Sequence, residues 1–291
     1  MSGWRRQGEW LEWRAAGDIQ GREQAKQLAS ALIGEKWSRT LLHNGGLLWQ
    51  GSRLRLRLFP EEPNVQADEW TDIEFLYEDD FCFVADKPAG MKVHPTAEGE
   101  KGTLLQAAAS RLAAEGQLCR PRHIHRLDED TTGPVLFAKY DWVQTILDAR
   151  MREKSIGRTY VAFVQGRLAK AKGRIDAPIG RDRHHPTRRR VSPTGESAVT
   201  LYERLETYPD AALVRLTLET GRTHQIRVHL SHLGHPLIGD ALYGGRRDAI
   251  GRQALHGEAL VFPHPFTNEP VAVSSPWPAD FGALQERLKN L

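Results

Sequence analysis

The sequence predicts an α+β protein with a mixed, largely antiparallel sheet and a small basic module at its N-terminal end. Strand patterns and helix patterns follow one another at irregular spacing, which argues against regular βαβ winding. The 291 residues are 40% hydrophobic and 26% charged, as in globular proteins with one large core and room for an accessory unit. Residues 58–86 contain ten Asp or Glu and no Lys or Arg, between two basic regions. We therefore expect a module over 1–68 that ends in an acidic linker, and a main domain over 69–291.

The N-terminal module is expected to be a helix followed by a hairpin. Residues 22–36 place five apolar side chains at helical spacing, from Ala25 to Ile33. Residues 41–59 then alternate apolar and basic side chains, which indicates a hairpin with a basic face. The segment 60–72 holds two prolines and five acids and is expected to be the linker.

The main domain is expected to begin with a strand, a turn and a strand over 73–88. The helix that follows has Thr103 as its N-cap candidate and Gly116 as its end. The last third mixes short strands with proline-rich turns. The other expected elements are strands at 134–139, 158–166 and 212–221, helices at 141–154 and 223–234, and a basic loop at 180–190.

Composition excludes several classes of protein. No stretch approaches the ~20 apolar residues of a membrane helix, and the charged N-terminus has no apolar run of a secretion signal. Cys82 and Cys119 lie far apart and form no CxxC pair, so neither a disulfide framework nor a cysteine zinc site is expected. The sequence has no Gly-Lys dipeptide and hence no Walker loop of the usual form. We expect a cytoplasmic protein that is not bound to a membrane.

Three histidines at every third position, His229, His232 and His235, raise the question of a metal site. On a helix the first and the last would differ by about 120° around the axis, and His235 follows the helix-ending Gly234. Three ligands would not converge, so we expect no metal and interpret these side chains as solvated or hydrogen-bonded.

The segment 122–133, RHIHRLDEDTTG, places the single carboxylate of Asp128 among Arg122, His123, His125 and Arg126. Neighbouring cations lower the pKa of a carboxyl group and keep it ionised, which makes a poor general acid. Such a group can be a nucleophile, a base or the partner of a sugar cation. No second acid in a comparable motif completes the usual glycosidase pair. A plain turn or ion-pair role for Asp128 stays open at this point.

Two further basic segments suggest an anionic ligand. In the helix at 223–234, Ile226, Leu230 and Leu233 form an apolar stripe, whereas His224, Arg227 and Ser231 lie on another face. Donors gathered at the start of this helix favour an anion or a carboxylate, unless Arg227 is an ordinary surface arginine. The loop at 180–190 carries five arginines and is either a solvated run of charge or a mobile arm that binds a nucleic-acid backbone.

The segment HRLDEDTTG resembles the HRLD-x-x-T-S-G signature of the RluA-type pseudouridine synthases, which convert uridine in RNA to its C5-linked isomer. The resemblance continues in the family's order through RTYVAFVQG, the 180–190 region, TGRTHQIRVHLSHLGHPLIGDALYGG and RQALHGEALVFPHPF, over residues 75–281. Thr132 stands where the signature has serine, which keeps the hydroxyl. Residues 1–60 resemble the small S4 RNA-binding domain in outline.

The resemblance implies three catalytic residues and no cofactor. Asp128 would be the catalytic aspartate, Tyr160 the aromatic ring that stacks on the uracil, and Arg227 the partner of the aspartate. Ile226 would form an apolar wall, and Arg126 would enter the RNA stack where the uridine leaves it. The residues expected to contact RNA are His125, Arg126, Arg158, Arg181, Arg183, Arg188, Arg189, Arg190, Arg222 and His224.

The implied reaction flips a uridine out of structured RNA, breaks its N1–C1′ bond, turns the base and joins C5 to C1′. Tyr160 would hold the base and take the C5 proton. We expect ribosomal rather than transfer RNA as the target, and a monomeric enzyme. Two alternatives remain: a non-catalytic RNA-binding or ribosome-assembly factor on the same fold, and a metal-dependent hydrolase that uses the histidines.

Overall fold

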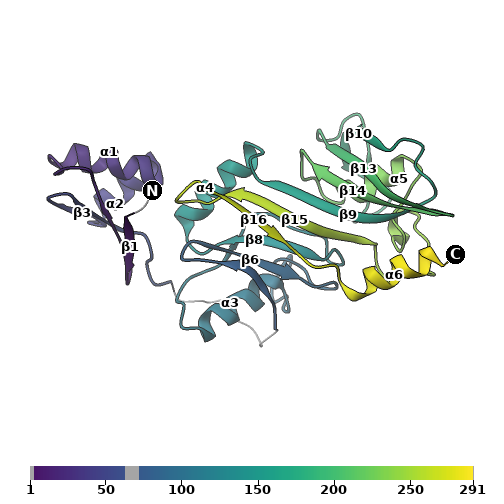
Figure 1. The fold of residues 1–291 in the computed structure, drawn as a ribbon, viewed down its shortest axis with the longest axis horizontal. Helices are drawn as coiled ribbons and strands as arrows, with labels where there is room; N and C mark the ends of the chain where they lie inside the picture. Colours follow the sequence, from purple (N-terminus) through teal and green to yellow (C-terminus); the bar gives the residue numbers. More distant parts are fainter. Residues whose placement is uncertain (1–2, 63–71, 291) are drawn as a thin grey trace.

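The computed structural model describes residues 3–62 and 72–290, and within them the α+β prediction is confirmed. The molecule is elongated, with the N-terminal module at one end of the main domain (Figure 1). The expected domain boundary at 68/69 and most of the expected acidic linker lie outside the described residues. In the described part of the chain, no helix has the length and apolar character needed to cross a bilayer.

The N-terminal module pairs two helices with a four-stranded antiparallel sheet in the order β1-β2-β4-β3. Its elements are β1 (Trp4–Gln7), β2 (Trp10–Arg14), α1 (Arg22–Ile33), α2 (Glu35–His43), β3 (Leu47–Gln50) and β4 (Arg53–Arg57). The β3–β4 hairpin was predicted, but the single helix over 22–36 was wrong. Gly34 adopts φ 82°, which ends α1 and starts α2.

Aromatic contacts join this module to the main domain. The Trp4 ring lies 5.2 Å from that of Phe81 and 5.4 Å from that of Phe266, both edge-on. The indole of Trp142 donates to the carbonyl of Leu58 at 2.9 Å. The module and the main domain therefore share one continuous hydrophobic core.

Two antiparallel sheets form the main domain. The larger has the order β10-β13-β14-β9-β15-β16 and the smaller has the order β5-β6-β8-β7. Most of the predicted strands and helices are confirmed to within a few residues. The strands are β5 (Phe75–Glu78), β6 (Cys82–Lys87), β7 (Arg122–His123), β8 (Gly133–Ala138), β9 (Gly157–Gln165), β10 (Lys172–Asp176), β11 (Ile179–Arg181), β12 (Arg189–Val191), β13 (Val199–Tyr208), β14 (Ala211–Leu218), β15 (Leu255–Pro263) and β16 (Pro270–Ser274). The helices are α3 (Leu104–Ala114), α4 (Asp141–Arg152), α5 (Gln225–His232), the 3-10 turn η1 (Ala241–Tyr243) and α6 (Ala279–Lys289).

The two sheets meet at a glycine contact. Gly133 has φ 122°, and a Cβ on it would lie 2.4 Å from the carbonyl oxygen of Gly257. Beside it, the hydroxyl of Thr132 hydrogen-bonds Nδ1 of His256 at 2.8 Å. The turn that follows Asp128 is thereby fixed to the seam between β8 and β15.

The two faces of β9 have different surroundings. Val161 and Phe163 pack with Phe281 of α6 on one face. Because side chains alternate along a strand, Arg158 and Tyr160 point to the opposite face. That face is open to the cleft described below.

One predicted loop is a small sheet. Residues 179–191 form a hairpin in which β11 pairs with β12. The predicted basic loop at 180–190 is therefore confined to the turn at 182–188, and its two ends are strands. The carboxylate of Asp182 accepts hydrogen bonds from the amide of His184 and from Nε of Arg188, which closes the turn. The arginines are thus presented on a defined backbone.

Candidate active site

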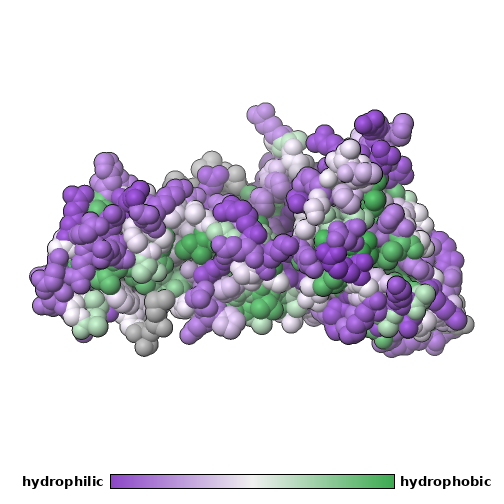
Figure 2. Space-filling view, turned by 90° about the horizontal axis from the view of Figure 1, so that it is seen from above, coloured by the Kyte–Doolittle hydropathy of each residue, from purple (hydrophilic) through white to green (hydrophobic). Residues whose placement is uncertain are grey.

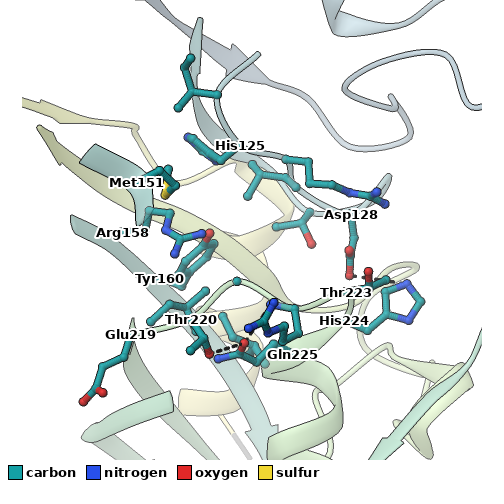
Figure 3. A pocket seen from close by; sticks show the side chains of 18 of the residues that line it. His125, Asp128, Met151, Arg158, Tyr160, Glu219, Thr220, Thr223, His224 and Gln225 are labelled. Carbon is teal, nitrogen blue, oxygen red and sulfur yellow. Dashed lines mark hydrogen bonds and ion pairs between the residues drawn. The ribbon is translucent and has the colours of Figure 1, made fainter. Parts of the chain in front are cut away.

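A cleft of about 720 Å³ brings together residues from β9, α4, α5 and the segments 123–131 and 218–224. Figure 3 shows Arg158 and Tyr160 on one wall, with Asp128 and His224 on the other. Nine of the predicted site residues line it: His125, Arg126, Asp128, Arg158, Tyr160, Arg222, His224, Ile226 and Arg227. Segments distant in the sequence therefore converge on one site.

Two buried basic side chains, Lys87 and Arg252, hold the loop that carries Asp128 by donating hydrogen bonds to its backbone carbonyls. The ammonium group of Lys87 donates to the carbonyls of Pro88, Met91 and Glu129 at 2.5–2.8 Å. Burial lowers the pKa of Lys87 to about 8. A guanidinium nitrogen of Arg252 donates to the carbonyl of Asp130 at 3.0 Å. Neither basic residue was singled out in the sequence, because their roles depend on the fold.

Arg227 lies between two carboxylates. Its Nη1 is 3.1 Å from Oδ2 of Asp128, while Nε and Nη2 donate to both oxygens of Asp240 at 2.7 and 2.9 Å. The Tyr243 ring lies 5.0 Å from the guanidinium carbon. Burial alone would lower the pKa of Arg227, but the two carboxylates outweigh it and raise the pKa above its usual value. Arg227 is therefore a permanently charged, buried residue rather than a surface arginine.

Asp240 was missed in the sequence. It follows Gly239 in the segment PLIGDALYGG, and its side chain is 1% exposed. The carboxylate of Asp240 accepts hydrogen bonds from two of the three guanidinium nitrogens of Arg227. The third nitrogen, Nη1, therefore binds Asp128. An aspartate within a glycine-rich segment is a signal for a turn, but its partner is fixed only by the packing of α5 on η1.

His224 and Tyr243 link the cleft to the arginine hairpin. His224 adopts a left-handed conformation with φ 57°, and its Nδ1 lies 2.8 Å from the Tyr243 hydroxyl. That hydroxyl accepts a hydrogen bond from the amide of Arg189 at 2.9 Å. Burial lowers the pKa of His224, so its Nε2, which is 3.9 Å from Asp128, adds no charge at neutral pH.

The basic residues next to Asp128 in the sequence do not surround it. Arg122 instead donates to Glu62, to Asp141 and to backbone carbonyls. His125 accepts a hydrogen bond from the amide of Leu136 through Nε2 at 3.2 Å. Burial, with Arg158 and His123 nearby, lowers the pKa of His125 to about 3. The expectation that the loop's own cations surround Asp128 is therefore wrong for Arg122 and His125, whereas Arg126 lines the same cleft. The ion pair of Asp128 comes from α5.

Tyr160 and Ile226 form the less polar part of the cleft. Tyr160 is 5% exposed and lies across from Gly257 of β15, which has no side chain to cover the ring. Burial raises the pKa of its phenol, which is therefore neutral at pH 7.

Gln225 fixes the turn that precedes α5, since its Oε1 accepts hydrogen bonds from the Thr220 hydroxyl and from the amide of Arg222.

The five arginines of the hairpin separate into two groups. Arg181 and Arg189 face each other across the strands and line a second cavity of about 430 Å³. This cavity shares Gly221, Arg222 and Thr223 with the cleft. The remaining three line neither cavity: Arg183, Arg188 and Arg190. Arg188 is in an ion pair with Asp182.

Two further carboxylates, Asp148 and Glu219, also line the cleft. Glu219 points away from Asp128 in Figure 3 and lies 3.9 Å from Nε of Arg174. Of the three carboxylates that line the cleft, Asp128 is the one in an ion pair with Arg227. The arrangement offers a positioned carboxylate, a guanidinium in an ion pair with it, and an aromatic ring on the facing wall.

Outside the cleft, Asp79, Cys82 and His264 are the group of possible metal ligands found among the described residues. The Asp79 oxygens already accept from the amides of Phe81 and Cys82, from Tyr77 and from His264. Nδ1 of His264 accepts from the amide of Thr267. These contacts tie β5, β6 and the 264–268 turn together and leave the carboxylate fully engaged.

Comparisons with known proteins agree with this geometry. The family model described as RNA pseudouridylate synthase matches residues 81–232. An uncharacterised RNA pseudouridine synthase of Bacillus subtilis is 44% identical over 85% of this chain and 80% of its own length. The ribosomal large subunit pseudouridine synthase D of Pseudomonas aeruginosa is 37% identical over 93% of each chain.

A solved structure is similar as well. The human RNA pseudouridylate synthase domain containing 1 superposes with a TM-score of 0.61 at 26% identity, over 71% of this chain and 84% of that one. The resemblance to the RluA-type enzymes seen in the sequence is therefore confirmed. The chain belongs to the RNA pseudouridylate synthase family and is an isomerase that acts on RNA.

Proposed function

We propose that Asp128, Arg227 and Tyr160 carry out the isomerisation of a uridine in structured ribosomal RNA. The observation that carries this proposal is the ion pair between Asp128 and Arg227, with Tyr160 on the facing wall of the same cleft. A uridine stacked on Tyr160 would present its ribose to Asp128. The reaction needs no cofactor, since the product is an isomer of the uridine and the proton that C5 loses is balanced by one that N1 gains.

Each side chain has a distinct role in this proposal. The carboxylate of Asp128 acts on the ribose, either as a nucleophile or as a base that removes a sugar proton, and the N1–C1′ bond breaks. The freed uracil turns between Tyr160 and Ile226, and C5 bonds to C1′ as the ester to Asp128 breaks or, in the second case, as Asp128 returns the sugar proton. The Tyr160 phenol is neutral, so its oxygen takes the C5 proton as its own hydroxyl proton passes to water. N1 gains a proton from water, and the product is an isomer. Arg227 orients Asp128 through their ion pair.

Recognition of the RNA is assigned to the basic residues around the cleft. Arg126 is exposed at the rim and would fill the gap left by the flipped base. Arg181, Arg189 and Arg222 surround the adjoining cavity and would contact the backbone. The remaining predicted RNA-binding side chains are His125, His224, Arg158, Arg183, Arg188 and Arg190. Figure 2 shows one face of the molecule, which is covered mainly by hydrophilic side chains.

The N-terminal module is proposed to be an S4-like RNA-binding domain in a monomeric, cytoplasmic enzyme.

The match to the large-subunit enzyme of Pseudomonas aeruginosa covers 93% of both chains and supports a target in large-subunit ribosomal RNA rather than in transfer RNA.

The test is to map pseudouridines in total RNA from cells with and without this gene. We expect loss of the modification at a few uridines of ribosomal RNA, with transfer RNA unchanged. Wild-type protein should restore those sites, and Asp128→Asn should not. Full restoration of growth by Asp128→Asn would favour the alternative of a non-catalytic assembly factor.

A further inference from the structure

The wall of the cleft that faces Asp128 carries three basic side chains, and the one acid of α4 that also lines the cleft, Asp148, acts on Arg152 alone among them. Arg152 at the end of α4, Lys154 in the following turn and Arg158 at the start of β9 all line the cleft. Within the described ranges, no carboxylate lies within ion-pair distance of any of the three. Arg152 and Lys154 are exposed, whereas Arg158 is half-buried, so the charge leads from the rim inward.

Arg158 is the unusual member of this group. Its Nε is buried and has no hydrogen-bond partner among the described residues. Its guanidinium lies against the backbone of Gly221, where a Cβ would come within 2.7 Å of Nη1. A buried donor of a charged side chain that lacks an acceptor is unfavourable, and such groups are rare unless a ligand or water completes them.

The neighbouring side chain cannot supply the missing acceptor. His125 uses Nε2 to accept from the amide of Leu136, so its proton lies on Nδ1, which is also buried without a partner. His125 is neutral at pH 7, because burial and the nearby Arg158 lower its pKa to about 3. This corner of the cleft therefore offers donors and one full positive charge.

An anionic group of the substrate would complete the corner. Uracil and ribose are neutral, and the negative charge of a nucleotide is on its phosphate, which a guanidinium can bind with two parallel N–H groups. Arg158 and Tyr160 are two residues apart on the same face of β9, which separates them by about 7 Å, the scale of one nucleotide. A base on Tyr160 therefore brings its own backbone within reach of Arg158.

We propose that Arg158, extended by Lys154 at the rim, binds a phosphate that directly flanks the flipped uridine. This subsite lies on the wall opposite Asp128, and the inference rests on the proposed function of the cleft. Its consequence is positional: the phosphate anchor and the stacking ring would fix the nucleotide so that its ribose faces Asp128.

The test pairs a protein change with a change in the RNA. The substrate is a synthetic RNA hairpin that contains the uridine identified by mapping, labelled with tritium at C5. It carries either natural phosphates or one uncharged methylphosphonate on the 5′ or the 3′ side of that uridine. Release of tritium measures the reaction, since C5 loses its hydrogen.

For the wild-type enzyme, we expect one of the two methylphosphonates to lower kcat/KM by about ten-fold, the contribution of one charge-assisted hydrogen bond. Arg158→Gln should lower kcat/KM on natural RNA by a similar factor and show no further loss with that methylphosphonate. Arg158→Lys keeps the positive charge but cannot donate two parallel N–H groups. Its kcat/KM on natural RNA should lie between those of the wild type and Arg158→Gln. Arg287→Gln on α6, which covers the other face of the sheet, is the control and should behave as wild type.

The outcomes separate this inference from the proposed function. If the wild-type enzyme releases no tritium from any RNA, the proposed function fails. If it is active but Arg158→Gln loses the same factor on all three RNAs, Arg158 contacts the base or the ribose and the phosphate subsite is refuted. An Arg158→Gln enzyme with wild-type kcat/KM would refute it as well. Circular dichroism of each variant checks that the fold is intact, and Arg158→Lys keeps the test informative if Arg158→Gln does not fold.

Discussion

Replacing Asp240 by asparagine should damage the site without touching a residue proposed to contact the substrate. The carboxylate is 1% exposed and accepts two hydrogen bonds from Arg227 at 2.7 and 2.9 Å. Asparagine keeps one acceptor oxygen, but its amide group would point N–H donors at the guanidinium. Breaking a buried ion pair lowers the free energy of unfolding by about 3–5 kcal/mol, and the remaining hydrogen bond recovers part of this. We therefore expect the free energy of unfolding to fall by about 3 kcal/mol.

The catalytic effect follows from the freed guanidinium. With the neutral asparagine at position 240, Asp128 is the one carboxylate left to Arg227. The guanidinium can then rotate and donate two N–H groups to Asp128. A displacement of about 1 Å at the reacting groups can lower a rate by about 100-fold, so tritium release from C5-labelled RNA should fall by that order. The dissociation constant for RNA should change by no more than a few-fold, because Asp240 is buried behind Arg227.

The matched control is Asp210→Asn, which breaks an ion pair between exposed side chains of Asp210 and Arg246. Exposed pairs contribute about 0–1 kcal/mol, so this variant should resemble wild type in urea unfolding at pH 7 and in rate. If Asp240→Asn matched wild type in both measurements, the view that Asp240 positions Arg227 would be refuted.

Four other substitutions test three separate features: the arginine hairpin, His125 and Tyr160. Arg181→Gln and Arg189→Gln should each weaken RNA binding and reduce its dependence on the logarithm of salt concentration by about one unit; an unchanged slope would contradict backbone contacts by the hairpin. His125 has a folded-state pKa of about 3, well below the ordinary 6.5, so between these values only the unfolded chain binds the proton and stability falls as pH is lowered. From pH 6.5 to 5 this amounts to about 2 kcal/mol, and His125→Gln, which can still accept from Leu136, should lose that part of the pH dependence in urea unfolding. Tyr160→Phe keeps the ring but not the hydroxyl, and should slow product formation at least about 100-fold with unchanged stability; a wild-type rate would assign the C5 proton to another group.

Local sequence signals predicted much of the fold. Thr103 caps α3 with a capping box, as its position before an apolar run indicated. The hairpin of β1 and β2 was missed because its strands are short and their apolar and polar residues do not alternate regularly: β1 reads WRRQ and β2 reads WLEWR, with Leu11 as the buried residue. Gly34 lay inside a helical pattern, and its left-handed backbone, which glycine permits, divides that pattern into two helices.

The site was only partly readable from the sequence. The resemblance named Asp128, Tyr160 and Arg227, and the structure brings them into one cleft. The neutrality of His125 could not be read, because it depends on burial and on the amide of Leu136, which is eleven residues away. Asp240 was equally hidden, since it meets Arg227 only after α5 and η1 have packed together. Charge next to Asp128 in the sequence was misleading, because tertiary contacts direct Arg122 elsewhere.

Single-turnover conversion of the C5-tritiated RNA by Asp128→Asn, at enzyme concentrations above the dissociation constant, tests the central assignment most directly. Asparagine keeps the size of the side chain and one acceptor for Arg227, but it provides no carboxylate for the ribose. We predict RNA binding within a few-fold of wild type and no release of tritium. Conversion at a rate near that of wild type would contradict the assignment of Asp128 as the group that acts on the sugar.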